Sequence, residues 1–317
     1  MNNRLLTAIL ILFACQVFGQ HLPLYSAQND QIGVINPAAL NHDQMMNGFN
    51  MTFGGSFRRQ WLQLENGPVT QFVRGDYMFH DGDALGLVFG GHLINDQTGP
   101  TGFTGGYGRI GVIIGDPEFG GISAGLHGGL VQYRINVSDI ELRDKNDVLV
   151  GNDQSQLHPD IGAGVFAWKR MESGLLDDCL VYAGVSIPQV LGLDLAFQTV
   201  EGEFGLRRVQ HYYGTAGIYK PLSNDRYLRI SNWTLYAPGA KVRSDLDIRF
   251  LFSENFWIGT GASTNGSFHL ETGFISFPGG GYDRQFRVGY MYDYAFSNIG
   301  PDIGSSHQIQ MVYALDY

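Results

Sequence analysis

The stretch KVRSDLDIRFLF, residues 241–252, alternates between apolar and charged side chains. Neighbouring residues of a β-strand point to opposite faces, so this pattern predicts a strand with one apolar and one charged face. A soluble sheet would turn the charged face to bulk water, whereas a membrane barrel would turn it into the lumen. The apolar face holds Val242, Leu246, Ile248, Phe250 and Phe252, and the charged face holds Lys241, Arg243, Asp245, Asp247 and Arg249.

The composition favours the membrane barrel. The 317 residues include 44 Gly, 21 Phe and 16 Tyr, and only 16% are charged. Glycine is about twice as frequent as the usual ~7%. Beyond the N-terminal apolar run the chain has no apolar stretch that could span a membrane as a helix, and strands cross lipid only as a closed barrel. We therefore expect an all-β protein, a transmembrane antiparallel β-barrel.

The N-terminus has the pattern of an export signal. The apolar run from Leu5 to Phe18 covers 14 residues, against the ~20 that a spanning helix needs. It predicts a secretory signal peptide over residues 1–19. Cys15 follows a sequence that resembles a lipoprotein box, but Phe13 is bulky where a small residue is usual. Once the signal is removed, Cys179 is the only cysteine, so no intramolecular disulfide can form.

The remaining chain divides into two parts. Residues 48–317 are expected to form the barrel. Residues 20–47 form an N-terminal segment that either plugs the lumen or reaches a periplasmic partner, and the sequence leaves both open.

Fourteen segments have the length and alternation of barrel strands, and an even number suits a single-chain bacterial barrel. They are residues 48–61, 67–79, 84–94, 105–115, 121–134, 160–169, 179–187, 211–220, 227–236, 241–252, 255–264, 267–277, 284–294 and 307–317.

The connections between these segments alternate in length. Those after even-numbered strands are short and turn-like, which is typical of periplasmic turns. The long connections all follow odd-numbered strands and are expected to be extracellular loops. They are residues 95–104, 135–159, 188–210 and 295–306.

The first strand ends in two adjacent arginines. Its apolar phase, from Phe49 to Phe57, is expected to face lipid. Arg58 then faces the lumen, and Arg59 leaves the lipid face beside Trp61, where its head group can reach the membrane interface. The pair predicts a membrane boundary.

Enzyme-like motifs lack their structural context. The glycines of GGYGRIGV, residues 105–112, fit a dinucleotide pattern, but a strand and a turn follow instead of a helix. GISAG around Ser123 has the spelling of a nucleophile elbow, but it continues as a strand; with His127, four residues on, a lipid hydrolase is a distant alternative. The histidines show no metal-ligand spacing, and the net charge of −10 disfavours nucleic acid. We expect no catalytic residues, cofactor or metal.

Several segments together resemble the PorP/SprF family, outer-membrane components of the type IX secretion system of Bacteroidota. They run in the same order over nearly the whole chain after the signal. They are VINPAAL (34–40), SFRRQWLQLENGPVTQF (56–72), YAGVSIPQVLG (182–192), HYYGTAGIYKPL (211–222), FWIGTGA (256–262) and FRVGYMYDYAFSNIGPDIGSSHQIQMVYAL (286–315).

The resemblance implies a non-enzymatic barrel in outer-membrane lipid that works with the secretion machinery and a secreted cargo protein, such as a gliding adhesin with a C-terminal sorting domain. A periplasmic lipoprotein is a further implied partner. A passive outer-membrane channel or hydrophobic-solute transporter is the alternative, because a fold does not fix a function.

The resemblance also selects residues. Family members commonly have Glu after His307, whereas this chain has Gln308, which questions any ion pair there. Asp293 lies on the lumen phase and is expected to pair with Arg58 or Arg287. The residues that match the family pattern are Asn36, Pro37, Arg58, Arg59, Gln60, Trp61, Tyr290, Asp293, Ser306 and His307.

Overall fold

The computed structural model describes residues 28–80, 82, 84–136, 153–199, 202–222, 226–280, 283–296, 302 and 304–317. The expected signal peptide and Cys15 lie outside these residues.

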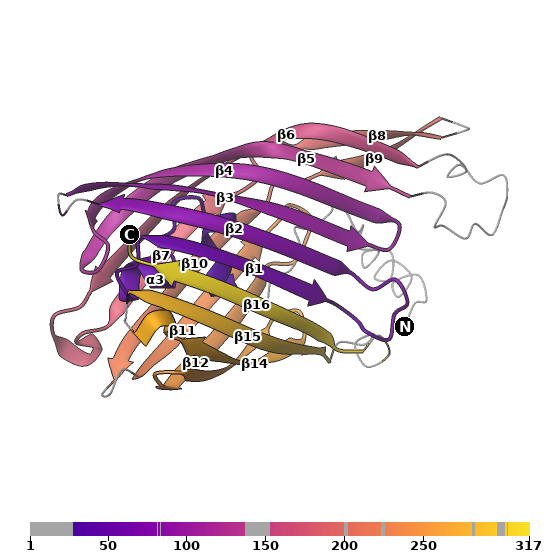
Figure 1. Cartoon of the computed structure of the whole chain (residues 1–317). Helices are drawn as coiled ribbons and strands as arrows, with labels where there is room; N and C mark the ends of the chain where they lie inside the picture. The colour runs from indigo at the N-terminus through magenta and orange to yellow at the C-terminus, as the bar shows by residue number, and fades with distance from the viewer. Residues whose placement is uncertain are drawn as a thin grey trace, which may run out of the picture.

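In the described part of the chain, fourteen strands form one closed antiparallel barrel (Figure 1). Each overlaps one of the fourteen predicted segments, so the predicted fold is confirmed. The strands are β1 (Met51–Arg59), β2 (Val69–His80), β3 (Leu85–Thr98), β4 (Thr101–Asp116), β5 (Gly120–Ile135), β6 (Gln154–Arg170), β7 (Leu180–Ile187), β10 (Tyr212–Leu222), β11 (Arg226–Tyr236), β12 (Arg243–Ser253), β13 (Phe256–Ser263), β14 (Ser267–Ser276), β15 (Arg284–Ala295) and β16 (Ser306–Leu315).

Neighbouring strands are neighbours in sequence at all but two places. The barrel closes where β1 pairs with β16, from Met51 opposite Leu315 to Arg59 opposite His307. β7 pairs with β10, because a separate hairpin of β8 (Leu193–Thr199) and β9 (Gly202–Arg208) lies between them in sequence. This hairpin falls in the predicted loop 188–210, where the sequence did not reveal strands.

The two faces of the wall follow the predicted alternation. On β12, Asp247 and Arg249 are buried, whereas Leu246 and Ile248 are exposed. In a membrane barrel an exposed apolar side chain on this face contacts lipid. The charged phase of the strand therefore lines the lumen.

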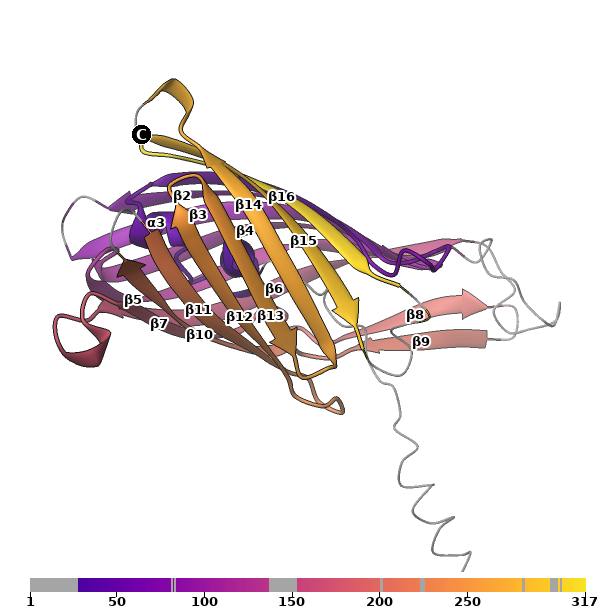
Figure 2. The ribbon, with the colours of Figure 1, turned by 90° about the horizontal axis from the view of Figure 1, so that it is seen from below.

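The two ends of the barrel differ, as Figure 2 shows. At the short-turn end, β12 and β13 are separated only by residues 254–255. At the long-loop end one prediction is wrong: residues 95–104 do not form a long loop. β3 and β4 continue to Thr98 and Thr101 and meet in a tight turn in which Gly99 adopts φ 54°. Strands longer than the membrane requires extend beyond it here.

The start of β1 also differs from the prediction. Phe49 is buried and its backbone N–H donates to the carbonyl of Asp43, so it is not part of the lipid-facing band. Phe53 and Phe57 are exposed, as expected. Trp61 lies beyond the end of β1, in a positive-φ conformation.

Short helical turns complete the structure. The N-terminal segment forms η1 (Gln28–Gln31), α2 (Ile32–Ile35) and α3 (His42–Met46), and two more turns, η3 (Gly174–Leu176) and η4 (Pro278–Gly280), lie in connections at the short-turn end. Among the described residues there is no helix with the length and hydropathy to cross a membrane.

Candidate functional site: the plug in the lumen

Residues 28–49, here called the plug, lie inside the barrel (Figure 1). Local chemistry shapes this segment. Asn36 has an extended backbone, which the following Pro37 favours, and its side-chain oxygen accepts from the N–H of Ala38 at 3.0 Å. α3 begins with a capping box in which Asn41 and Gln44 exchange hydrogen bonds. These contacts give the buried backbone N–H groups of Ala38, Asn41 and Gln44 a hydrogen-bond partner.

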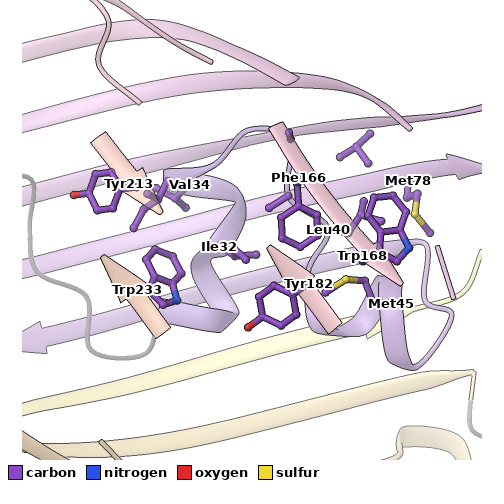
Figure 3. Close-up of a cluster of buried hydrophobic side chains, with 14 of the residues drawn as sticks. Ile32, Val34, Leu40, Met45, Met78, Phe166, Trp168, Tyr182, Tyr213 and Trp233 are labelled. Atoms are coloured by element: carbon purple, nitrogen blue, oxygen red, sulfur yellow. The ribbon is translucent and has the colours of Figure 1, made fainter. Parts of the chain in front are cut away.

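Apolar side chains attach the plug to the wall (Figure 3). Leu40 and Met45 are fully buried and belong to one cluster with Phe166 and Trp168 of β6, and the same cluster includes Ile32 of the plug and Trp233 of β11. Burying one such side chain stabilises the folded state by about 1.5–3 kcal/mol. The plug is therefore part of the main apolar core of the protein.

The wall also binds the plug backbone. Arg109 Nη1 of β4 donates to the carbonyls of Pro37 and Ala39 at 3.1 and 2.9 Å. Ser123 Oγ of β5 donates to the carbonyl between them, that of Ala38, at 2.6 Å. Asp76 holds Arg109 in place through a 2.7 Å contact to Nε. Two side chains of the wall thus donate hydrogen bonds to three successive carbonyls of the plug.

Glycines of the wall make room for this approach. A Cβ at Gly125 would come within 2.5 Å of the Pro37 carbonyl oxygen, and one at Gly164 would collide with the side-chain oxygen of Asn36. The amide of Asn36 in turn donates to the carbonyl of Val165 at 3.0 Å. Glycine is required at position 125 because the plug backbone passes so close, and at position 164 because the Asn36 side chain does.

Two carboxylates of the plug enter a cluster of arginines. Asp43 forms a bidentate pair with Arg287 of β15, one of whose contacts measures 2.8 Å. Asp30 contacts Arg249 of β12 at 3.2 Å and Arg287 at 3.4 Å. Arg249 is also held by Glu271 at 2.6 Å. All five groups are buried, so the pairs are protected from screening by salt.

The electrostatics of the plug carboxylates follow from these contacts. Burial alone would raise the pKa of Asp30, but the guanidinium groups of Arg249 and Arg287 hold it well below its usual range. Burial also opposes ionisation of Asp43, and Arg287 outweighs that effect, so the pKa of Asp43 is lowered. Both side chains are therefore anionic at neutral pH and depend on the wall to remain so.

His42 is the third titratable group of the plug. Burial lowers its pKa from 6.5 to about 3, although neighbouring Asp43 favours the proton. Its ring lies between Tyr219 and Tyr227, with centroids 5.1 and 5.0 Å away. The imidazole is therefore neutral in the docked plug at neutral pH.

The family-pattern residues near the barrel seam lie close together at the long-loop end. Arg58 forms the expected pair with Asp293 at 2.6 Å, whereas Arg287, the other expected partner, is occupied by the plug. Gln308 accepts from Arg58 at 3.4 Å. The pair therefore bridges β1 and β15 across β16.

Other residues of this set also contact one another. The N–H of Trp61 donates to Ser306 Oγ at 3.3 Å, and the Tyr290 hydroxyl contacts Nδ1 of His307. Gln60 is buried and Arg59 is exposed. Asn36 and Pro37 are separate from this group, in the plug.

The sequence analysis missed the residues that hold the plug: Asp30, Asp43, Asp76, Arg109 and Arg249 were not selected. One signal was available. Asp30 and Asp43 are the only charged residues between positions 20 and 47. Two isolated carboxylates in a segment that precedes an arginine-rich barrel indicate that they form ion pairs with the arginines of the lumen.

The enzyme-like motifs have structural roles. The Ser123 hydroxyl donates to the plug backbone. His127, on the same strand, places its Nε2 2.7 Å from the carbonyl of Pro188. The two side chains have different partners and form no Ser-His pair. The glycine-rich residues 105–112 lie within β4. No group of three or more metal-ligating side chains occurs in the part of the chain that the structure describes.

The closed wall, its apolar outer face and its charged lumen define an outer-membrane β-barrel protein. Residues 18–313 match the model of a family described as type IX secretion system membrane protein PorP/SprF, and the chain belongs to this family. The resemblance drawn from the sequence is thereby confirmed, as is the outer-membrane location. No curated protein matches the chain.

Two solved structures have a similar fold. The CymD monoaromatic hydrocarbon channel has a TM-score of 0.58 and 12% identity, over 86% of this chain and 90% of that chain. The Pseudomonas putida toluene transporter TodX has a TM-score of 0.53 and 9% identity, over 95% of this chain and 100% of that chain. At these identities the likeness concerns the fold alone.

Proposed function

We propose that this protein is a non-enzymatic component of the type IX secretion system that assists the secretion or surface attachment of a partner protein, such as a gliding adhesin with a C-terminal sorting domain. Family membership carries this proposal. Its partners would be the secretion machinery, the cargo and a periplasmic lipoprotein. The domain division is proposed accordingly: a signal peptide over residues 1–19, an N-terminal periplasmic or plug segment over 20–47 and a barrel over 48–317.

The occupied lumen supports a role other than passive conduction. Ile35, Leu40 and Asp43 of the plug are buried inside the barrel. Any solute that crossed the lumen would have to displace them. A barrel whose interior is packed is better suited to present a surface or to respond to a partner than to serve as a permanent pore.

For the family-pattern residues we propose structural roles. Arg58 and Asp293 would stabilise the barrel seam, and Asn36 with Pro37 would set the path of the plug. None of these side chains is assigned chemistry on a substrate.

The test compares surface and secreted proteins of the native bacterium with and without this gene by mass spectrometry, with the reintroduced gene as control. We expect the loss of one or a few large proteins that share a C-terminal domain. An unchanged set of proteins in the deletion strain would contradict the proposal.

A passive channel or hydrophobic-solute transporter is the second candidate, because the similar structures include a hydrocarbon channel and a toluene transporter. The lumen argues against an apolar route, since Asp30, Arg249 and Glu271 meet in its interior. Ion conductance in a planar bilayer and toluene uptake into proteoliposomes distinguish the two. Steady conductance or uptake by the natural protein would favour the channel.

A further inference from the structure

We propose that the lumen wall is a binding site for an acidic peptide segment of another protein, and that the plug occupies this site as an intramolecular substitute. The site would be exposed when the plug moves out. This inference deepens the proposed function, because a secreted or periplasmic partner is the natural source of such a segment, but the binding itself can be tested without it.

The wall recognises a peptide backbone and does not simply fill space. Arg109 and Ser123 donate to the carbonyls of residues 37, 38 and 39 in succession. These contacts depend on carbonyl groups, which every peptide carries, and not on the side chains of this stretch. A small anion would satisfy at most part of this set of donors.

The wall also carries cations that require carboxylates. Among the residues that the structure describes, the carboxylates left to Arg229, Arg249 and Arg287 without the plug would be Asp247 and Glu271. An unpaired charge in a buried site is strongly unfavourable. Displacement of the plug therefore favours a replacement that brings its own carboxylates, and an acidic peptide combines these with the carbonyls that Arg109 binds.

The wall has a passage shaped for a peptide main chain. Gly125 leaves space for the plug main chain, since a Cβ there would come within 2.5 Å of the carbonyl oxygen of Pro37. Gly33 of the plug likewise lies close to the wall, since a Cβ there would come within 2.8 Å of Arg109 Cζ. Close main-chain approach of this kind is a feature of peptide recognition that side-chain packing alone does not require.

The plug has room and a joint for movement. A cavity of about 430 Å³ at the short-turn end is bordered by His42, Met46 and Phe49 of the plug. Near the C-terminal end of the plug, after α3, Asn47 is exposed and Gly48 adopts φ 68°. Rotation about this joint would carry α3 into the cavity and towards the periplasm, while β1 stays paired.

The experiment uses the full-length protein in detergent and a fluorescein-labelled synthetic peptide with the sequence of residues 28–47. In a Cys179→Ala background, Gln31→Cys and Ser56→Cys are introduced, because these side chains are hydrogen bonded at 2.9 Å, and a short thiol crosslinker fixes the plug to β1. A second protein, Asp30→Asn with Asp43→Asn, weakens the intramolecular plug.

Fluorescence anisotropy should show saturable binding to the Asp30→Asn, Asp43→Asn protein, at least ten-fold tighter than to the crosslinked protein. A peptide in which both aspartates are asparagine should bind at least ten-fold more weakly than the natural peptide, and a scrambled peptide should not bind. Maleimide labelling of a single cysteine at position 31 reports whether the plug has left the wall.

Equal binding to the crosslinked and weakened proteins would overturn the proposal, as would equal binding of the Asp and Asn peptides. Failure of the peptide to bind when labelling shows the plug displaced would also overturn it, and so would a plug that stays in place in the weakened protein. Binding of the peptide together with unchanged surface proteins in the deletion strain would leave the peptide site standing and refute only the secretion role.

Discussion

Arg58 on β1 and Asp293 on β15 are joined at 2.6 Å, although they are 235 residues apart and β16 lies between their strands. Gln308 of β16 stands beside the pair. Asp293 thus provides the negative charge beside Arg58, whereas Gln308 is neutral. The seam between β1 and β16 is thus stabilised by the charge of Asp293 on the neighbouring strand β15.

Replacing Asp293 with Asn should destabilise the barrel, because the buried guanidinium of Arg58 would keep its charge and lose the carboxylate of Asp293. Loss of one partner of a buried pair typically costs about 3–5 kcal/mol, and we expect a cost of about 1–3 kcal/mol here, since Asn can still accept a hydrogen bond. The apparent melting temperature, from far-UV circular dichroism in detergent, should fall. Asp283→Asn, at an exposed pair with Arg284, is the control. An equal melting temperature for both variants would refute the role of the buried pair.

Replacing Asp43 with Asn should release part of the plug. The bidentate ion pair with Arg287 would become a neutral–charged contact. The apolar contacts of Met45 and Leu40 would still hold α3. Because the contacts of Asp30 and His42 with the wall remain, we expect partial release and a several-fold rise in mean ion conductance in a planar bilayer over that of the natural protein. Asp177→Asn, in an exposed turn, should leave conductance unchanged, and a rise for this control as well would point to a general loosening of the barrel.

Adding a methyl group at position 125 should displace the plug without harming the wall. In Gly125→Ala the new Cβ would meet the Pro37 carbonyl at 2.5 Å, and the plug would have to shift. The matched control is Gly108→Ala on the neighbouring strand, where a Cβ meets nothing within 4 Å. We expect faster proteolysis of residues 28–49 in the first variant only, measured by mass spectrometry of the fragments. Equal cleavage in both would mean that this approach does not hold the plug.

Acid should weaken plug docking in two stages. His42 has a docked pKa of about 3, below its ordinary 6.5, so a released plug binds a proton between these values and the docked plug does not. Docking is therefore strongest above pH 6.5 and weakens as the pH falls towards 3. The pKa values of Asp30 and Asp43 are also lowered, so their contribution is present above pH 3.8 and is lost below it.

Conductance measured from pH 8 to pH 3.5 tests whether acid weakens the docking of the plug. It should rise as the pH falls below about 6.5. In His42→Phe, which preserves the ring between Tyr219 and Tyr227, the rise should begin at lower pH. A conductance that falls with acid, or an identical profile in the variant, would contradict the assignment to His42.

The sequence predicted the wall of this protein better than its interior. A strand pattern with period 2 is local, so β12 and the lumen phase of Arg58 could be derived from neighbouring residues. Asp30 and Arg249 are 219 positions apart, and no local pattern reveals which arginine a distant carboxylate will meet. Phe49 was assigned to lipid because its phase matched β1, but its backbone contact with Asp43 overrides the alternation. β8 and β9 were missed because their hairpin lies outside the barrel wall.

The nine-residue seam between β1 and β16 has a consequence for biogenesis. The last strand of the chain completes the wall, so the cylinder cannot close before synthesis and export of the C-terminus are finished. The plug precedes the first strand and has its bulky side chains among those of β6 and β11. It can therefore pack against them while the sheet is still open, before β16 seals the wall.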